Sequence, residues 1–278
     1  MDRTRRLLSM IEKMSNEKSA ILFFVLVLTI GFLGYTPMVL SSYGLMPGYL
    51  AGASVLIGGM SPTLAAVITF YVRDGKKGPK ILLEGFKRRF SAVWLLVALA
   101  LPLVVFYGAW TLSKTVLGGP EVAGIDLLMV SVFLLQMFAM NVWEEIGWRG
   151  CAQPILQAKY APLVSSLLIG AVWSVWHIPL FVVNNSQMLD VYGSFLVFVP
   201  FVMADAVVYG WLYNSTNGNL VVATLYHAMT NAIGGALLYA GIVVPAQMLL
   251  LIISIVAAVA VAADRHTMVS GDDAVAIE

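Results

Sequence analysis

The chain has 278 residues, of which 60% are hydrophobic and only 11% are charged, and its mean hydropathy is +0.89. A soluble domain carries about 25% charged residues, so this composition excludes a soluble protein and predicts an integral membrane protein. The net charge of +1 gives no indication of a nucleic-acid partner. The single cysteine, Cys151, excludes an internal disulfide and a multi-cysteine metal site, and we expect it to be an inert packing thiol.

Eight apolar runs are long enough to cross a bilayer, which takes about 20 residues of helix. None of them alternates polar and apolar residues as a barrel strand does. The sequence therefore predicts an all-α, polytopic membrane helix bundle of about eight transmembrane helices. We expect one integral membrane domain over residues 1–278, with polar tails at 1–19 and 264–278. The expected spans are 20–40, 49–72, 91–117, 127–157, 161–183, 193–213, 220–241 and 244–263.

The distribution of Lys and Arg predicts that both termini are cytoplasmic. In that orientation every Lys and Arg except Lys114 and Arg149 lies on the cytoplasmic side. The outer loops 118–126 and 184–192 contain no Lys or Arg. The basic loop 73–89 is explained more simply by this orientation rule than as a site for anionic lipid or substrate. The inner set comprises Arg3, Arg5, Arg6, Lys13, Lys18, Arg73, Lys76, Lys77, Lys80, Lys87, Arg88, Arg89, Lys159 and Arg265.

The stretch 141–150, Asn-Val-Trp-Glu-Glu-Ile-Gly-Trp-Arg-Gly, places two carboxylates and a guanidinium next to an apolar run. A charge at the centre of a membrane helix costs about 2.5–3.5 kcal/mol on insertion scales, so such residues are functional candidates. Glu145 and Arg149 are i,i+4 with the acid first, the favourable orientation for an ion pair. Glu144 points about 100° away and is expected to have no local partner and to be available for chemistry. The alternative is a cluster of charges at the lipid headgroups.

Two histidines and an asparagine lie in later spans. His177 follows Trp173 by one turn, so its ring can contact the indole, and Pro179 is expected to disturb the helix just beyond it. His227 and Asn231 are one turn apart on one helix face. Taken singly, a histidine in a membrane helix is more often an interhelical hydrogen-bonding group than a catalyst.

The expected depths of these groups allow them to meet. At 1.5 Å per residue they differ by at most about 14 Å along the membrane normal, a gap that tilts and kinks can close. The four groups are Glu144, His177, His227 and Asn231. Such a set, in the inner half of the membrane, can activate water and stabilise a tetrahedral oxyanion. Asp205, in the sixth span, is expected to support Arg149 or neutralise a histidine.

Three motifs on successive spans combine these residues. They are Glu144-Glu145-x-x-x-Arg149, Trp173-x-x-x-His177 and His227-x-x-x-Asn231. Together they resemble the signature of the CPBP family, which comprises the type II CAAX prenyl endopeptidases and their prokaryotic relatives and is also called the Abi family. The resemblance covers about residues 125–245, the motif-bearing core. Trp173 stands where Phe is commoner, and we expect this difference to matter little for an apolar contact.

The resemblance implies an eight-helix intramembrane protease whose site opens towards the cytosol. Glu144 would be the general base acting on water, and His177 would help to hold that water. His227 and Asn231 would stabilise the oxyanion. The supporting residues would be Glu145 and Arg149.

We therefore expect a multi-pass integral membrane endopeptidase of the CAAX-processing type, acting near the cytoplasmic side. Its partners would be the lipid bilayer and a peptide or lipidated-peptide substrate. The substrate stays open between a prenylated CAAX C-terminus, a peptide precursor and a segment of a membrane protein. No nucleic acid is expected to bind. In a prokaryote the protein would lie in the cell membrane.

Three alternatives stay open. Zinc could bind Glu144, His177 and His227, leaving Asn231 as the oxyanion donor, but no His-x-x-x-His pair preforms such a site on one helix, so we expect no cofactor. A non-catalytic immunity or scaffold protein that retains the fold would carry the same spans. A proton-coupled transporter would also use buried acids and histidines, although we find no inverted repeat and no paired broken helices.

Overall fold

The computed structural model describes residues 14–118 and 126–276, and within these ranges the chain forms helices and no strand. Eight helical segments of the described chain are long and apolar enough to cross a membrane. The prediction of an all-α bundle is therefore confirmed, and the protein is a multi-pass integral membrane protein. The spans are Asn16–Ser42, Tyr49–Glu84, Val93–Leu117, Leu127–Gln157, Pro162–Val182, Phe195–Ser215, Leu220–Tyr239 and Ala246–Ala263.

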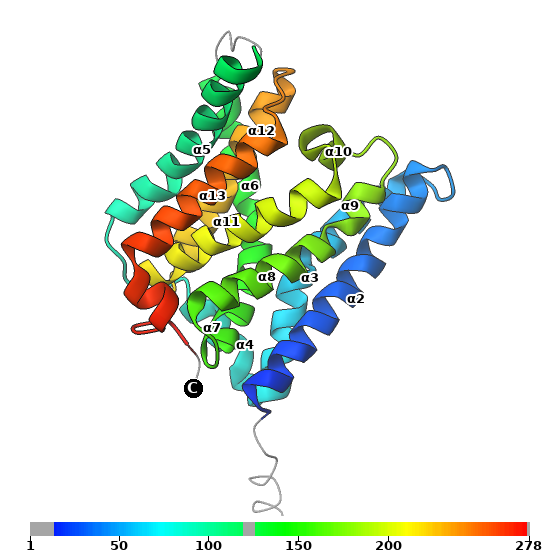
Figure 1. Ribbon diagram of the computed structural model, residues 1–278. Helices are drawn as coiled ribbons and strands as arrows, with labels where there is room; N and C mark the ends of the chain where they lie inside the picture. The colour runs from blue at the N-terminus through cyan, green and yellow to red at the C-terminus, as the bar shows by residue number, and fades with distance from the viewer. Residues whose placement is uncertain (1–13, 119–125, 277–278) are drawn as a thin grey trace, which may run out of the picture.

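The long helices pack in an order that closes on itself (Figure 1). Neighbours in this order are α2, α3, α6, α12, α5, α13, α11 and α8, and α8 returns to α2. The start of α2 and the end of α13 lie at the same end of the bundle, where α4 (Gly78–Glu84) also lies. Which side of the membrane this end faces stays a prediction. The bounds are α2 (Asn16–Ser42), α3 (Tyr49–Asp74), α5 (Val93–Leu117), α6 (Leu127–Gly147), α8 (Pro162–Trp176), α11 (Phe195–Ser215), α12 (Leu220–Tyr239) and α13 (Ala246–Ala263).

Side-chain caps fix where three of these helices begin. Asp126 accepts hydrogen bonds from the first-turn amides of α6, Ser194 does so for α11, and Asn219 does so for α12. Each cap satisfies amides that have no partner within the helix. The caps therefore determine the residues at which α6, α11 and α12 begin.

The span expected to run unbroken over 127–157 contains a π-helical turn. Helix α6 ends at Gly147 and is followed by η2 (Trp148–Ala152) and α7 (Gln153–Gln157). The Thr63 hydroxyl of α3 donates to the Trp143 carbonyl, and a Cβ at Gly147 would collide with Pro62, so α3 packs closely where the regular helix stops. π-Turns are rare and frequently mark functional sites. Cys151 lies in this turn and is fully buried.

The next span is interrupted at His177, as Pro179 predicted. Helix α8 stops at Trp176, and α9 (Ile178–Val182) follows. Proline has no N–H to donate to the carbonyl four residues earlier, and its ring clashes with that carbonyl. The backbone N–H of His177 bonds instead to Ser174. His177 is thereby placed at a junction between two helices.

Segments expected to be loops or tails contain short helices. The loop 73–89 includes η1 (Gly75–Lys77) and α4, and the outer loop 184–192 includes α10 (Gln187–Tyr192). Residues 264–276, expected to belong to a polar tail, include η3 (His266–Ser270), and Met268 is fully buried against the bundle. The backbone of Val275 holds this segment in place: its N–H donates to Oδ1 of Asn214, and its carbonyl accepts from Nε2 of Gln157. The polar-tail interpretation was therefore incomplete, because the segment has a buried anchor.

Candidate active site

A cavity of about 240 Å³ inside the bundle is lined by all four of the residues predicted to be catalytic. Glu144 comes from α6, and His177 from the junction between α8 and α9. His227 and Asn231 come from α12. The structure thus brings together, from three parts of the chain, the four side chains that the sequence placed at similar depths in the membrane. Their catalytic roles stay predictions.

The Glu144 carboxylate is held by two donors. Its Oε2 accepts a hydrogen bond of 3.0 Å from Nε1 of Trp173, and its Oε1 accepts one of 3.5 Å from Nδ2 of Asn141. The expectation that Glu144 has no local partner was therefore wrong, since Asn141 lies one turn earlier on the same helix. Both contacts leave lone pairs on the carboxylate, which can still accept a proton from water.

Asn141 connects the remaining polar groups of the cavity. Its Nδ2 lies 3.2 Å from Nε2 of His227, and its Oδ1 accepts a hydrogen bond of 3.2 Å from Asn231. The side chain is buried and also contacts Glu144. We did not identify Asn141 as a site residue from the sequence. The signal was present, because Asn141 is a polar residue at the end of an apolar run and one helical turn before both glutamates.

Glu145 and Arg149 form the predicted ion pair in a fully buried setting. Arg149 Nε lies 3.3 Å from Oε2 of Glu145, and Nη1 donates to Oε1 at 3.4 Å. The guanidinium also lies over two aromatic rings, with Cζ 3.9 Å from the ring centroid of Tyr209 and 4.8 Å from that of Trp173. One carboxylate and two π faces together stabilise a charge that would otherwise be costly to bury.

Both ring nitrogens of His227 are engaged by protein groups. Nδ1 lies 2.8 Å from Oε1 of Glu145, and because a carboxylate only accepts, Nδ1 carries the hydrogen. Nε2 then accepts from the Asn141 amide as that amide is oriented here. In this tautomer Nε2 carries no hydrogen, so His227 can donate to an oxyanion only when Nε2 is protonated and Asn141 has moved. Asn231 is exposed to the cavity and has one amide hydrogen left, so it is the more available donor.

The ring of His177 is oriented by the break in its helix. Because the backbone N–H of His177 bonds to Ser174, the Trp173 carbonyl is free to accept from Nδ1 of His177 at 2.8 Å. Nδ1 thus carries the hydrogen, and Nε2 keeps a lone pair that can accept from water. Trp176 and Phe198 hold the ring edge-on, with centroids 4.8 and 4.9 Å away.

Residues 126–233, which contain all of these groups, match the family described as Type II CAAX prenyl endopeptidase Rce1-like. This part of the chain is therefore similar to the CPBP family. A curated relative, CAAX prenyl protease 2 from Methanococcus maripaludis, is 32% identical over 104 residues. These residues make up 36% of this chain and 38% of the relative. The similarity to CPBP proteins is thus concentrated in the part of the chain that carries the three motifs.

One residue of the CPBP signature differs here in its chemistry. Trp173 occupies the position where Phe is commoner, and we expected an apolar contact in which the difference would matter little. The structure shows otherwise, since the indole N–H donates to Glu144 and a phenyl ring has no such donor. The indole also lies 5.4 Å from the His227 ring, centroid to centroid.

Asp205 lines the same cavity but contacts neither Arg149 nor a histidine directly. Its Oδ1 accepts a short hydrogen bond of 2.6 Å from the Tyr226 hydroxyl, which is buried on α12. Asp205 interacts electrostatically with His227 and Arg149 without a hydrogen bond to either, and its expected supporting role stays a prediction. Asp205 also joins α11 to α12.

Beyond the polar groups, the cavity wall is aromatic and aliphatic. These side chains come from α9, α10 and the first turns of α11, at the end of the bundle opposite α4. The resemblance to CPBP proteases implies an opening towards the cytosol, and which side of the membrane this lining faces stays a prediction. The residues are Leu180, Met188, Tyr192, Phe198 and Phe201.

The geometry does not fit the zinc alternative. In residues 14–118 and 126–276, no group of three or more His, Cys, Asp or Glu side chains is arranged to hold a metal ion. The proposed ligand His227 has both nitrogens engaged, so a metal would have to displace Asn141.

Proposed function

We propose that the protein is an intramembrane endopeptidase of the CAAX-processing type that hydrolyses a peptide bond with water activated by Glu144. The observation that carries this proposal is the arrangement around the Glu144 carboxylate. Trp173 and Asn141 orient it, and the lone pair of His177 and the free amide hydrogen of Asn231 border the same cavity. A base, a water-holding group and an oxyanion donor are the parts that acyl transfer to water requires.

The reaction follows from these positions. Water, held by Glu144 and Nε2 of His177, attacks the scissile carbonyl carbon while Glu144 takes one of its protons. A carbon–oxygen bond forms, and the carbonyl electron pair becomes an oxyanion that accepts a hydrogen bond from Asn231. The tetrahedral intermediate then collapses, the carbon–nitrogen bond breaks, and Glu144 returns the proton to the departing amine.

We propose that the reaction needs no metal. The amide of Asn231 would stabilise the oxyanion in place of a Lewis acid, and His227 would join it only when Asn141 has moved and Nε2 is protonated. Glu145 and Arg149 do not reach the substrate in this scheme. They fix the tautomer of His227 through the hydrogen bond to Nδ1.

The proposed substrate is the prenylated C-terminus of a CAAX-type peptide. The supporting observations are the name of the Methanococcus relative and the apolar wall that adjoins the polar groups. The cavity, at about 240 Å³, is below the usual range of ligand pockets, about 300–1,000 Å³. It therefore encloses the scissile bond and its neighbours, and a prenyl chain would extend into the bilayer.

The test is to identify the products. Purified protein in liposomes is incubated with farnesylated and geranylgeranylated CAAX peptides and with the unprenylated peptide, and released tripeptide is detected by mass spectrometry. Wild type and the matched control Glu84→Gln, an exposed glutamate on α4, should release the tripeptide from a prenylated peptide. Absence of release from every prenylated peptide by folded wild-type protein would contradict the proposal.

A further inference from the structure

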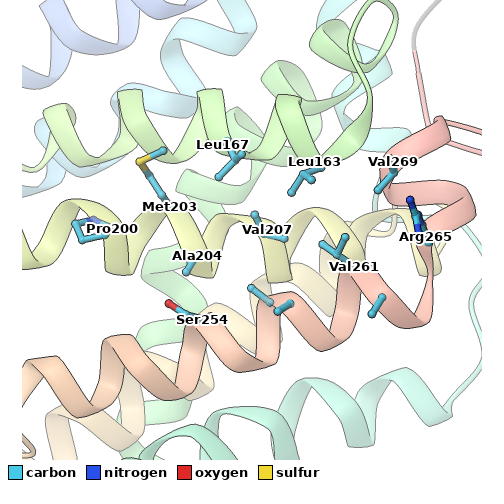
Figure 2. A pocket seen from close by; sticks show the side chains of 13 residues that line it. Leu163, Leu167, Pro200, Met203, Ala204, Val207, Ser254, Val261, Arg265 and Val269 are labelled. Carbon is cyan, nitrogen blue, oxygen red and sulfur yellow. The ribbon is translucent and has the colours of Figure 1, made fainter.

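A second cavity, of about 710 Å³, lies between α8, α11 and α13, away from the candidate active site (Figure 2). On α11 the side chains of Met203, Ala204 and Val207 line this groove, whereas Asp205 and Tyr209 line the active-site cavity. The two cavities share no lining residue. One helix thus separates the groove from the polar cluster.

The groove exists because small side chains lie between larger ones. Ala257, Ala258 and Ala262 of α13 leave the space, and Leu163 and Leu167 of α8 form the facing wall. The other lining residues are almost all apolar. This composition matches a hydrocarbon chain better than a polar ligand.

The dimensions of the groove match one leaflet of a membrane. Along α13 it extends from Ser254 to Arg265, which is about 16 Å at 1.5 Å per residue. The hydrocarbon core of a bilayer is about 30 Å thick, so the groove spans about half of it. Its Arg265 end lies at the end of the bundle that carries α4 and the basic loop 73–89.

A single cation marks that end of the groove. Arg265 is its one charged lining residue, is exposed, and has no ion-pair partner in the described part of the chain. Next to it, Nε2 of His266 lies 3.1 Å from a carboxylate oxygen of Asp272. Basic residues at this depth attract anionic headgroups by about 1 kcal/mol each.

We propose that this groove binds one anionic glycerophospholipid from the leaflet at the α4 end. One acyl chain lies along α13, and the phosphate contacts Arg265. The bound chain packs against the outer face of α11, whose inner face carries Asp205 and Tyr209. Occupancy therefore stabilises the folded protein, by an amount that rises with the logarithm of the lipid concentration above Kd.

The experiment measures lipid binding to the purified full chain by native mass spectrometry and by thermal unfolding. Phosphatidylglycerol and phosphatidylcholine with identical acyl chains are titrated separately. Wild type should bind phosphatidylglycerol more tightly, and Arg265→Gln should lose about fivefold in affinity for it, the factor equivalent to about 1 kcal/mol. Arg89→Gln, an exposed arginine in the loop 73–89 and outside the groove, is the matched control and should bind like wild type.

A second variant blocks the groove without changing the charge. Ala258→Trp, at an exposed position of α13, should release both lipids, and Ala262→Leu provides a milder block. The proposal is overturned if wild type binds both lipids equally, if Arg89→Gln weakens binding as much as Arg265→Gln, or if lipid is retained when the groove is filled. Equal stabilisation by glycerol phosphate would also overturn it, because it would show a phosphate site without a lipid chain.

Discussion

We expect Glu145→Gln to lower the free energy of unfolding by about 3–5 kcal/mol, because it leaves the Arg149 guanidinium buried without its counter-charge. Both side chains are fully buried, and two guanidinium nitrogens lie 3.3 and 3.4 Å from the carboxylate. The aromatic faces of Tyr209 and Trp173 remain, but a desolvated cation–π contact contributes only about 2 kcal/mol. These two aromatic contacts therefore offset only part of the stability lost with the Glu145 carboxylate.

The assay is reversible unfolding in mixed detergent micelles, followed by tryptophan fluorescence. Glu144→Gln is the matched control, since Glu144 is half-buried and is held by an indole and an amide, not by a cation. A hydrogen bond to a charged group contributes about 1.5–3 kcal/mol, and glutamine keeps one of the two acceptor oxygens, so the loss should stay below that of Glu145→Gln. The two adjacent substitutions should therefore differ clearly in stability.

A double variant tests the cause. Replacing a buried ion pair as a whole by uncharged groups is often neutral, so Glu145→Gln with Arg149→Met should recover most of the stability lost in Glu145→Gln alone. The reasoning is refuted if Glu145→Gln unfolds like wild type, or if adding Arg149→Met makes it less stable still.

Three further substitutions probe the cavity. Trp173→Phe keeps an aromatic ring but removes the donor to Glu144, so kcat should fall and the free energy of unfolding should fall by about 1.5–3 kcal/mol, the contribution of a hydrogen bond to a charged group. An unchanged kcat would show that this hydrogen bond is incidental. Asn141→Leu removes the contacts to Glu144, His227 and Asn231 at once, and turnover measured in liposomes should be lost at unchanged expression, whereas activity near the wild-type level would exclude Asn141 from the site. Asn231→Ala should lower kcat by about 10²–10³ at nearly constant KM. An active but less stable Asn231→Ala protein would instead point to a purely structural amide.

Hydropathy and helical periodicity predicted the bundle and the Glu145–Arg149 pair, because both depend on local spacing. They also placed Glu144, His177 and His227 at compatible depths. Contacts between helices could not be predicted in this way. Trp173 and Glu144 are 29 residues apart, and Asn141 and His227 are 86 apart, so their hydrogen bonds depend on how the helices pack.

Backbone irregularities were only partly predictable. Pro179 predicted the break at His177, since a proline in a helix removes a defined hydrogen bond. The π-turn η2 has no comparable residue signal, because it forms where α3 packs against Trp143 and Gly147. The docking of residues 264–276 was missed for a similar reason: Met268 alone gave no sign of its burial.

The central claim is that Glu144 activates water without a metal. The most direct test measures tripeptide release from a prenylated CAAX peptide by wild type and Glu144→Gln in liposomes, before and after chelation, with the zinc content of each preparation determined. We predict that wild type keeps its rate after chelation with far less than one zinc per chain, and that folded Glu144→Gln releases no tripeptide. Activity that follows zinc content, or that persists in Glu144→Gln, would contradict the mechanism.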